Sequence, residues 1–392
     1  MKVCVIGVGA DGYEALPDSD RQRIASADVV FGGDRHLRML GPGPQARHAW
    51  PSPLRAGLES WPQQFAGREV VALASGDPLL AGVATTLVEV LGRDVVEVRP
   101  AVSSVALARA RMRWSAESVT ELRDHRELPR WLFDGHRVLI LSEDEHTPAT
   151  VAAALREQGF GASRITVLGD LGAEHESQFT VSAEAWTGGQ VPRLNALAVE
   201  LAGPGTGGLA TGLDDEAFSH DGQLTRRDLR AAALARLAPT PGALLWDVGA
   251  GAGSVAIEWM RHHRSCHAVA IEADADRAAR IRQNAERLGA PRLDVVEGRA
   301  PEALTGLAQP QAVFIGGGAS QPGVVEACWS ALAPGGRLVV HAVTAQTESR
   351  LVDMYERYGG ELTRTHIEDA APLGRFTGWT PRRAVTQWAV RR

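Results

Sequence analysis

Three glycines at alternate positions stand where a predicted strand gives way to a predicted helix. Residues 243–248 form an apolar run typical of a buried strand, and Gly249, Gly251 and Gly253 follow it directly. Glycine lets a backbone turn tightly and approach a ligand, and the N–H groups at a helix start favour polar or anionic groups. Glu272 ends the next predicted strand, where a carboxylate can accept hydrogen bonds from a ribose diol. Together these features predict a nucleotide-binding site.

The spacing of the glycines distinguishes between nucleotide ligands. A dinucleotide fingerprint would place its third glycine at position 254, which is Ser254 here. Gly-x-Gly-x-Gly followed by an acidic strand end instead resembles the S-adenosylmethionine pocket of Rossmann-type methyltransferases. Many of those enzymes carry an acid for the adenine amino group where this sequence has Arg299. The resemblance therefore implies adenine contacts from backbone atoms near Arg299 and Ala300.

A predicted helix at residues 225–237 precedes the glycine-rich turn. Thr225 is its expected N-cap, with Asp228 completing an approximate capping box. Thr225 is also placed to line the cofactor site of this region, and the sequence leaves both roles open.

Strands and helices alternate through most of the chain, which predicts an α/β fold. In the second half, the predicted strands cover residues 243–248, 267–272, 292–296, 311–315, 336–343 and 384–390. In the first half, they cover residues 2–6, 28–32, 69–74, 95–98, 137–141, 165–168 and 196–201. A glycine-rich stretch without periodicity separates the halves. We expect a domain at 1–202 with lobes at about 1–112 and 113–202, a linker at 203–221, and a doubly wound domain at 222–392.

The N-terminal residues contain a misleading motif. Residues 7–12 match the dinucleotide fingerprint Gly-x-Gly-x-x-Gly, and Asp34 closes the next predicted strand. In that fold, Pro17 would fall in the third turn of the following helix and would cost it about 3 kcal/mol. The helix must therefore begin later. We interpret residues 9–17 as a loop at the rim of a cleft and expect no nicotinamide cofactor there.

Short motifs of the first 202 residues occur in the order found in tetrapyrrole (precorrin) methylases. They are the Gly-x-Gly loop at Gly7 and Gly9, Phe-Gly-Gly-Asp-Arg-His-Leu at 31–37, the Gly-Asp-Pro turn at 76–78, the helix start at Ser103 and Ser104, Leu-Gly-Asp-Leu-Gly at 168–172, and Asn-Ala-Leu-Ala-Val-Glu at 195–200. The resemblance implies a two-lobed fold that holds S-adenosylmethionine in a cleft. The implied contacts are Gly9, Gly76, Asp77, Ser103 and Ser104. Asp77 either faces the cofactor or only forms its turn.

The second half is similar to another family, the decarboxylating precorrin methyltransferases. The matching segments are residues 222–231, 246–259, 297–304 and 314–318. The two resemblances together imply a bifunctional enzyme of cobalamin biosynthesis with one S-adenosylmethionine per domain. The first half would methylate a precorrin at C5. The second would methylate C15 and decarboxylate the ring C acetate. No catalytic base or decarboxylation residue can be assigned.

The composition and charge of the sequence argue against several classes of binding partner. Net charge is −6, with 44% hydrophobic and 22% charged residues, so the basic footprint of a nucleic-acid binder is missing. No apolar run reaches bilayer length, and the N-terminus lacks a signal-peptide pattern, so we expect a cytoplasmic protein without membrane contact. His262, His263 and His267 follow a predicted helix end and indicate a solvated loop, so no metal site is expected. Cys4, Cys266 and Cys328 are expected to be reduced, mostly buried thiols.

Arginine carries almost all positive charge, because Lys2 is the only lysine. Guanidinium groups suit polycarboxylate ligands. Five arginines either bind such a ligand or lie on a solvated surface: Arg109, Arg111, Arg113, Arg382 and Arg383. The expected substrate is a small tetrapyrrole, and we expect a homo-oligomer of unspecified order.

Three other functions use the same glycine motifs. A nucleic-acid base methyltransferase shares Gly-x-Gly-x-Gly, but the sequence lacks a basic, aromatic-rich appendage and an Asn/Asp-Pro-Pro-Tyr/Phe loop. A nicotinamide oxidoreductase would use residues 7–12. A non-catalytic S-adenosylmethionine sensor would use residues 249–253 without methyl transfer.

Overall fold

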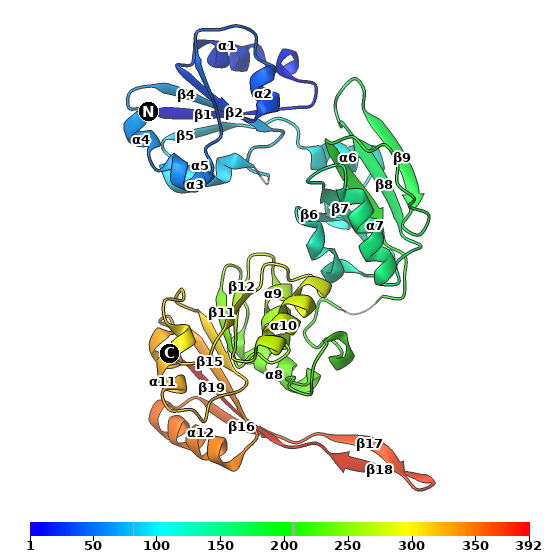
Figure 1. Ribbon diagram of the computed structural model, residues 1–392, viewed down its shortest axis with the longest axis vertical. Coiled ribbons are helices and arrows are strands. Elements are labelled where there is room, and N and C mark those ends of the chain that lie inside the picture. Colours follow the sequence, from blue (N-terminus) through cyan, green and yellow to red (C-terminus); the bar gives the residue numbers. More distant parts are fainter. Residues whose placement is uncertain (81, 206–207) are drawn as a thin grey trace. The chain divides into compact units, whose positions relative to one another are not determined.

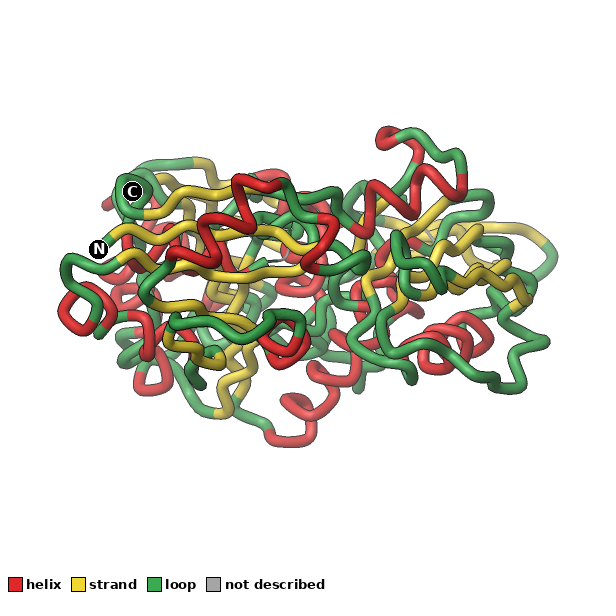
Figure 2. The backbone as a smooth tube through the Cα atoms, turned by 90° about the horizontal axis from the view of Figure 1, so that it is seen from above, coloured by secondary structure: helices red, strands yellow, loops and turns green. Residues whose placement is uncertain are grey.

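The computed structural model describes residues 1–80, 82–205 and 208–392. The chain divides into two units. The first consists of Met1–His125 and Leu132–Gly205, and the second of Arg126–Trp131 and Thr206–Arg392. Figure 2 colours the strands yellow and the helices red, so that their alternation along the backbone can be followed.

The first lobe of the first unit is built on a fully parallel sheet in the order β3-β2-β4-β1-β5 (Figure 1). Its strands are β1 (Lys2–Val8), β2 (Val29–Gly32), β3 (Ala46–Ala49), β4 (Glu69–Ser75) and β5 (Val96–Arg99). Its helices are η1 (Tyr13–Ala15), α1 (Asp18–Ser26), α2 (Asp34–Arg38), α3 (Leu54–Leu58), α4 (Trp61–Gln64) and α5 (Val83–Leu91). The central strands β1 and β4 are buried along most of their length, as parallel strands covered on both faces are.

The second lobe has a mixed sheet in the order β6-β7-β10-β8-β9. Its strands are β6 (Thr120–Leu122), β7 (Arg137–Leu141), β8 (Arg164–Gly169), β9 (Ser177–Ser182) and β10 (Asn195–Glu200). Its helices are α6 (Ser104–Met112), η2 (Ala116–Ser118) and α7 (Thr147–Glu157), and η3 (His125–Trp131) follows β6. The predicted two-lobed fold is confirmed.

The second unit contains a seven-stranded sheet in the order β13-β12-β11-β14-β15-β19-β16. The strands are β11 (Leu244–Val248), β12 (His267–Glu272), β13 (Asp294–Glu297), β14 (Ala312–Ile315), β15 (Arg337–Ala342), β16 (Glu361–Thr365) and β19 (Val385–Arg391). The first five are parallel, whereas β19 is antiparallel to both of its neighbours. Chain order reverses between β11 and β14, and ligands of doubly wound sheets bind at such a switch point.

Helices cover both faces of this sheet, as the predicted Rossmann-type fold requires. One apolar cluster contains side chains of α8 (Arg227–Leu237), α9 (Ser254–His262) and α10 (Ala275–Arg287). A second cluster contains side chains of α11 (Val324–Ala331) and α12 (Ala345–Tyr358). The 3-10 turns η4 (Asp215–Ala217) and η5 (Glu302–Leu304) complete the unit. Both faces of β11 and β14 are therefore buried.

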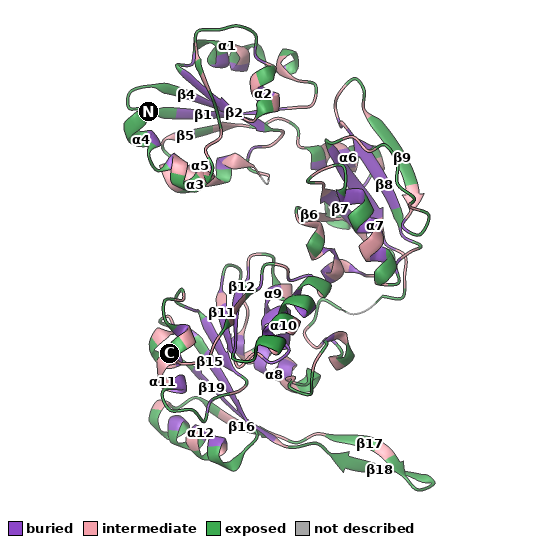
Figure 3. Cartoon of the chain, viewed as in Figure 1, coloured by how far each residue is buried: buried purple, intermediate pink, exposed green. Residues whose placement is uncertain are grey.

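A two-stranded hairpin extends from the second unit (Figure 1). It consists of β17 (Glu368–Leu373) and β18 (Phe376–Pro381), which pair only with each other. Most of its residues are exposed (Figure 3). The sequence analysis predicted no strand here.

The segment proposed as a linker is partly built into the second unit. Leu213 and Phe218 are buried in the cluster that contains α8 and α9. This part of the expected linker therefore packs on the second unit, because two apolar side chains separated by five positions reach its core. Residues 206 and 207 of the same stretch lie outside the described residues.

Candidate active sites

The glycine-rich turn after β11 depends on close backbone approach at two positions. Gly249 has φ of 69°, and a Cβ there would lie 2.7 Å from the carbonyl oxygen of Gly317. Gly251 has φ of 59°, and its Cβ would lie 2.7 Å from the carbonyl oxygen of Gln223. Both the left-handed conformation and the contact exclude larger side chains. Gly317 belongs to the loop after β14, so the turn occupies the switch point of the sheet.

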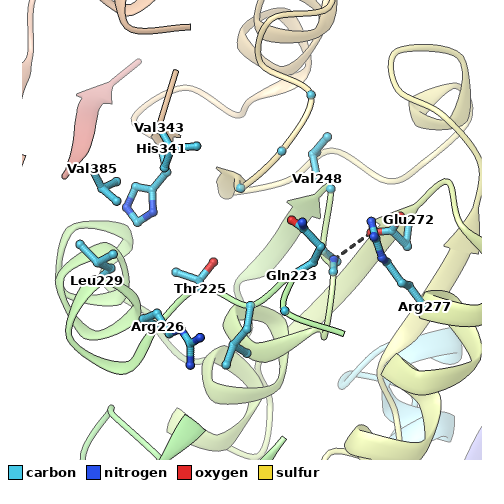
Figure 4. Close-up of a pocket in the computed structure, with 18 of the residues that line it drawn as sticks. Gln223, Thr225, Arg226, Leu229, Val248, Glu272, Arg277, His341, Val343 and Val385 are labelled. Carbon is cyan, nitrogen blue, oxygen red and sulfur yellow. Dashed lines mark hydrogen bonds between the residues drawn. The ribbon is translucent and has the colours of Figure 1, made fainter. Parts of the chain in front are cut away.

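Glu272 connects the glycine turn to the end of β12. Its side chain is buried, and its Oε2 accepts a hydrogen bond of 2.8 Å from the Gly251 N–H (Figure 4). Its Oε1 accepts a bond of 3.1 Å from the Asp274 N–H. The carboxylate therefore lies beside the turn, as the spacing of about twenty residues predicts.

Asp247 is a buried acid beneath the same turn that the sequence analysis missed. Its Oδ2 accepts a hydrogen bond of 3.0 Å from the Ala256 N–H, and its Oδ1 has no partner among the described residues. Burial, with a smaller contribution from the charge of Glu272, raises the pKa of Asp247 to about 7. A carboxyl group that keeps its proton near neutral pH can donate a hydrogen bond.

A cavity of about 980 Å³ lies at this end of the sheet. Six of the seven residues proposed for the C-terminal cofactor site line it: Thr225, Gly249, Gly251, Glu272, Arg299 and Ala300. Gly253 is the exception. It precedes the first residue of α9, and its Cβ would lie 2.7 Å from Cγ2 of Ile281 in α10. Gly253 therefore allows the two helices to pack closely.

Thr225 is not the N-cap of α8, so that prediction is wrong. The helix begins at Arg227, Arg226 is the capping residue, and no side chain of the cap makes a hydrogen bond. Asp215 supplies the acceptor at the start of the helix, because its Oδ1 accepts a hydrogen bond of 2.9 Å from the Arg227 N–H. Thr225 thus lies before the helix and lines the cavity.

A buried charge network holds this segment in place, and the sequence analysis also missed it. Arg230 is fully buried and donates from Nε to Oε1 of Glu258 at 2.6 Å and from Nη1 to Oδ1 of Asp215 at 3.2 Å. Glu258 in turn accepts from the N–H groups of Gly212 and Leu213 at 2.7 and 3.0 Å. The network fixes the chain between Gly212 and α8, which forms one wall of the cavity.

His341 contributes an imidazole to the cavity, across from Glu272 in the view of Figure 4. It lies opposite Gln387 in the pairing of β15 with β19, and its Nε2 is 2.9 Å from Oε1 of Gln387. The ring also meets Phe314 edge to face, with centroids 4.9 Å apart. Burial lowers the pKa of His341 to about 4, so the imidazole is neutral at neutral pH.

Two of the five arginines considered as carboxylate ligands, Arg382 and Arg383, line this cavity. Arg382 forms a two-bond ion pair with Asp369 at the base of the hairpin. Within the described ranges, Arg383 and Arg299 form no ion pair, so their charges are available. The other three lie in the first unit: Arg109 pairs with Glu121 at 3.4 Å, Arg111 with Glu176 at 2.5 Å, and Arg113 ends α6 in a left-handed conformation.

The first unit has a smaller cavity of about 170 Å³. All five proposed residues line it: Gly9, Gly76, Asp77, Ser103 and Ser104. The helix predicted to start late does so, because α1 begins at Asp18 directly after Pro17. The loop before it places Gly9 at the cavity, which agrees with the interpretation of a rim segment.

Backbone contacts dominate this smaller site. Gly76 has φ of 54°, and its carbonyl oxygen accepts the Ala101 N–H at 3.1 Å. Ser103 caps α6 by accepting the Ala106 N–H at 3.1 Å, as predicted. Asp77 Oδ1 accepts the Leu79 N–H at 2.9 Å, so it forms the turn and lines the cavity at the same time.

Three further features concern the cysteines, metal-binding groups and membrane spans. All three cysteines are buried. In the described part of the chain, no group of three or more His, Cys, Asp or Glu side chains is arranged to hold a metal ion. No helix in the described ranges is long and apolar enough to cross a membrane.

Comparison with known proteins decides the family. Residues 2–185 match the tetrapyrrole (corrin/porphyrin) methylase family model, and residues 216–392 match a precorrin methyltransferase domain. A precorrin-6Y C5,15-methyltransferase (decarboxylating) from Sinorhizobium sp is 45% identical over 394 residues, covering 98% of this chain and 95% of its own. The chain belongs to the precorrin-6Y C5,15-methyltransferase (decarboxylating) family. It is thus an S-adenosylmethionine-dependent methyltransferase.

Two further relatives of the precorrin-6Y C5,15-methyltransferase family match parts of the chain. A probable cobalt-precorrin-6B C15-methyltransferase (decarboxylating) from Pyrobaculum calidifontis is 30% identical over 176 residues, covering 43% of this chain and 90% of its own. The crystal structure of the C-terminal domain of precorrin-6Y C5,15-methyltransferase from Rhodobacter capsulatus is 45% identical. It covers 47% of this chain and 100% of that domain, with a TM-score of 0.45.

Proposed function

We propose that this chain methylates a precorrin twice, with one S-adenosylmethionine bound in each of two domains. The C-terminal domain methylates C15 and removes the carboxyl group of the ring C acetate, and the N-terminal domain methylates C5. The observation that carries the proposal is the large cavity of the second unit. It combines the glycine turn and Glu272 with Arg299 and Arg383, two cations without an ion pair among the described residues.

The proposed domains are residues 1–202 and 222–392, joined by 203–221. The ranges of the two family models, 2–185 and 216–392, support this division. A relative named for C15 methylation and decarboxylation alone covers 43% of this chain and 90% of its own length. That coverage supports placing these two reactions together in one half.

The C-terminal cavity fits S-adenosylmethionine in its residue types. The turn at Gly249 and Gly251 packs against the chain itself without side chains, and its bare backbone lines the cavity. Glu272 would accept hydrogen bonds from the ribose, and the backbone at Arg299 and Ala300 would contact adenine. When bound, S-adenosylmethionine supplies an electrophilic methyl group. In the N-terminal cavity, Gly9, Gly76, Asp77, Ser103 and Ser104 would hold the second molecule.

The rest of the C-terminal cavity fits a polycarboxylate. Arg299 and Arg383 line it without acidic partners among the described residues, whereas Asp369 neutralises Arg382. Guanidinium groups bind carboxylates with two parallel hydrogen bonds. We assign Arg383 and Arg299 to the acid side chains of the tetrapyrrole. Positioning by such contacts supplies much of the rate of a methyl transfer, because the reacting carbon must lie in line with the S–CH3 bond.

The bonds and electrons of the proposed C15 reaction balance without an external base. The bond between the acetate methylene and its carboxylate breaks, CO2 leaves, and the electron pair passes through the conjugated ring system to C15. That pair forms the new C–CH3 bond while the S–CH3 bond breaks. His341 is neutral and lines the cavity, and its Nε2–H donates to Oε1 of Gln387. Its Nδ1 can therefore accept a hydrogen bond without placing a charge beside the leaving carboxylate.

Product mass tests this function. The full chain is incubated with precorrin-6Y and methyl-labelled S-adenosylmethionine, and the tetrapyrrole is analysed by mass spectrometry. We expect two labelled methyl groups gained and one CO2 lost. Cofactor binding without methyl transfer would indicate a sensor, and label on nucleic acid instead of the tetrapyrrole would indicate a base methyltransferase. Either result would contradict the proposal.

We also propose a homo-oligomer, and a cytoplasmic location stays a prediction. The hairpin exposes Leu373, Phe376 and Trp379 by 68%, 66% and 73%. An isolated two-stranded hairpin is only marginally stable in water, so contact with a second copy would stabilise it. Light scattering should give a mass above that of one chain, and Phe376→Ser with Trp379→Ser should lower it. A monomeric wild type would contradict this proposal.

A further inference from the structure

The small cavity of the first unit contains one cation with no assigned role. Arg35 lies in α2 and lines the cavity together with Gly9 and Gly76. Asp77 is the other charged residue among those lining the cavity, and its Oδ1 already accepts the hydrogen bond of its own turn. The remaining walls are formed mostly by leucines and small residues. Arg35 is therefore the residue there that can attract an anion.

Arg35 has neutral neighbours instead of an acid. Its Nη2 is 3.0 Å from Nε2 of His36 and donates to Oγ of Ser75 at 3.2 Å. In the described ranges, no carboxylate forms an ion pair with it. The charge of Asp170 acts on Arg35 only at longer range. Oδ2 of Asp170 lies 3.5 Å from Nε2 of His175. Burial lowers the pKa of Arg35, which indicates that its charge is incompletely stabilised.

His36 orients this guanidinium without neutralising it. The ring is buried, and burial together with the charge of Arg35 lowers the pKa of His36 to about 4. A neutral ring can accept the Arg35 hydrogen bond at Nε2, with its own proton on Nδ1. Both contacts of Arg35 use Nη2, so Nε and Nη1 remain for a ligand. These two groups do not form a fork, because Cδ lies between them, so each can donate one charge-assisted hydrogen bond to a carboxylate oxygen.

We propose that Arg35, held by His36 and Ser75, binds a carboxylate in the cavity of the first unit. This inference rests on the proposed function, which supplies two sources of a carboxylate: the methionyl end of the cofactor and an acid side chain of the tetrapyrrole. Either carboxylate would be an acidic partner for Arg35, which is half-buried and forms no ion pair among the described residues.

The test compares Arg35→Gln with Arg38→Gln in the full chain. Arg38 lies on the same short helix but is exposed and does not line the cavity, so it is a matched control. Calorimetry measures binding of S-adenosylhomocysteine, which carries the methionyl carboxylate, and of 5′-methylthioadenosine, which lacks it. Steady-state kinetics measures KM of the decarboxylated C15-methyl tetrapyrrole in the C5 reaction. Removing a charge-assisted bond should weaken the affected step about ten- to hundredfold.

The outcomes separate the two sources. Weaker binding of S-adenosylhomocysteine at one site, with 5′-methylthioadenosine unaffected, supports the cofactor carboxylate. Unchanged cofactor binding with a raised KM in the C5 reaction supports the tetrapyrrole carboxylate. Values within twofold of the wild type in every assay would overturn the proposal. Arg35→Lys keeps the positive charge and a donor and should restore part of the loss. The wild-type chain, measured in the same assays, tests the proposed function separately. If it does not methylate C5, the proposed function fails whatever Arg35 does.

Discussion

The two cavities of this chain use different parts of the protein to form a binding site. In the second unit, charged side chains join the glycine turn: Glu272 accepts hydrogen bonds at a strand end, and Arg299 and Arg383 line the same space. In the first unit, the backbone dominates, with Gly76 close to Ser103 and one cation, Arg35. The difference teaches that the strand ends of a doubly wound sheet add charged side chains to a glycine turn, whereas the smaller cavity has mainly backbone groups and one cation.

The largest predicted effect concerns the glycine turn. Gly251→Ala introduces a Cβ 2.7 Å from the carbonyl oxygen of Gln223. We expect C15 methylation and CO2 release to fall about a hundredfold, because small displacements of a reacting pair cost that much. The control is Gly306→Ala, which has a similar φ of 82° but no atom within 4 Å of its Cβ. Equal losses in both variants would show that backbone strain, and not the cavity, is responsible.

The second prediction concerns the wall of the large cavity. Arg230→Met leaves Glu258 and Asp215 without their buried partner and should lower the free energy of unfolding of the second unit by about 3–5 kcal/mol. In the first unit, Arg55→Met breaks an exposed pair with Glu89, and the expected change is about 0–1 kcal/mol. Denaturant unfolding of both variants measures the contrast. A similar small change in each would argue against the buried network.

The third prediction concerns substrate binding by an arginine that lines the large cavity, compared with an arginine outside it. Arg383→Ala should raise KM for the tetrapyrrole in the C15 reaction about tenfold, which corresponds to about 1.4 kcal/mol, and should leave S-adenosylmethionine affinity unchanged. Arg375→Ala changes an exposed arginine near the hairpin tip that does not line the cavity, and should have no effect. If both variants bind tetrapyrrole as the wild type does, Arg383 has no role in substrate binding.

The smallest predicted effect is on stability against pH. The folded pKa of Asp247 is raised to about 7, above the ordinary value of about 3.9, so the folded state holds the extra proton. Stability from this group is present below about pH 4 and is lost as pH rises to about 7. Asp247→Asn should therefore be more stable than the wild type at pH 8, and the two should converge near pH 4.

Melting temperatures at both pH values measure this effect. A difference of 1 kcal/mol corresponds to about 2–4 °C in a domain of this size. Asp294→Asn, on an exposed position of β13, is the control and should leave the profile unchanged. If Asp247→Asn is no more stable than the wild type at pH 8, the acid is not held protonated by its burial.

Local signals predicted much of the fold. Strand β12 has its predicted limits, because its apolar run ends directly at an acid. Pro17 correctly placed the start of α1. The glycines of the turn and Glu272 could be paired because parallel strands bring their carboxyl ends together.

Contacts between distant residues could not be predicted in this way. Asp215 caps α8 from twelve positions upstream, so the Ser/Thr rule applied to Thr225 failed. Gln387 meets His341 only through the antiparallel register of β19, which the strand pattern did not specify. Leu213 and Phe218 were not predicted as core residues because they stand in a stretch rich in glycine and polar residues. The hairpin was not predicted because its strands lack the alternation of apolar and polar residues that marks a half-buried strand.

The central claim is that the two cavities carry out separate methylations. The most direct measurement is the product mass of full-length chains in which one cavity is blocked, with Gly76→Val in the first unit and Gly251→Val in the second. The account predicts that Gly76→Val yields a tetrapyrrole with one methyl group gained and one CO2 lost. Gly251→Val should leave the starting precorrin with its carboxyl group and without the C15 methyl. A doubly methylated product from a Gly76→Val chain that binds only one cofactor molecule would contradict the account.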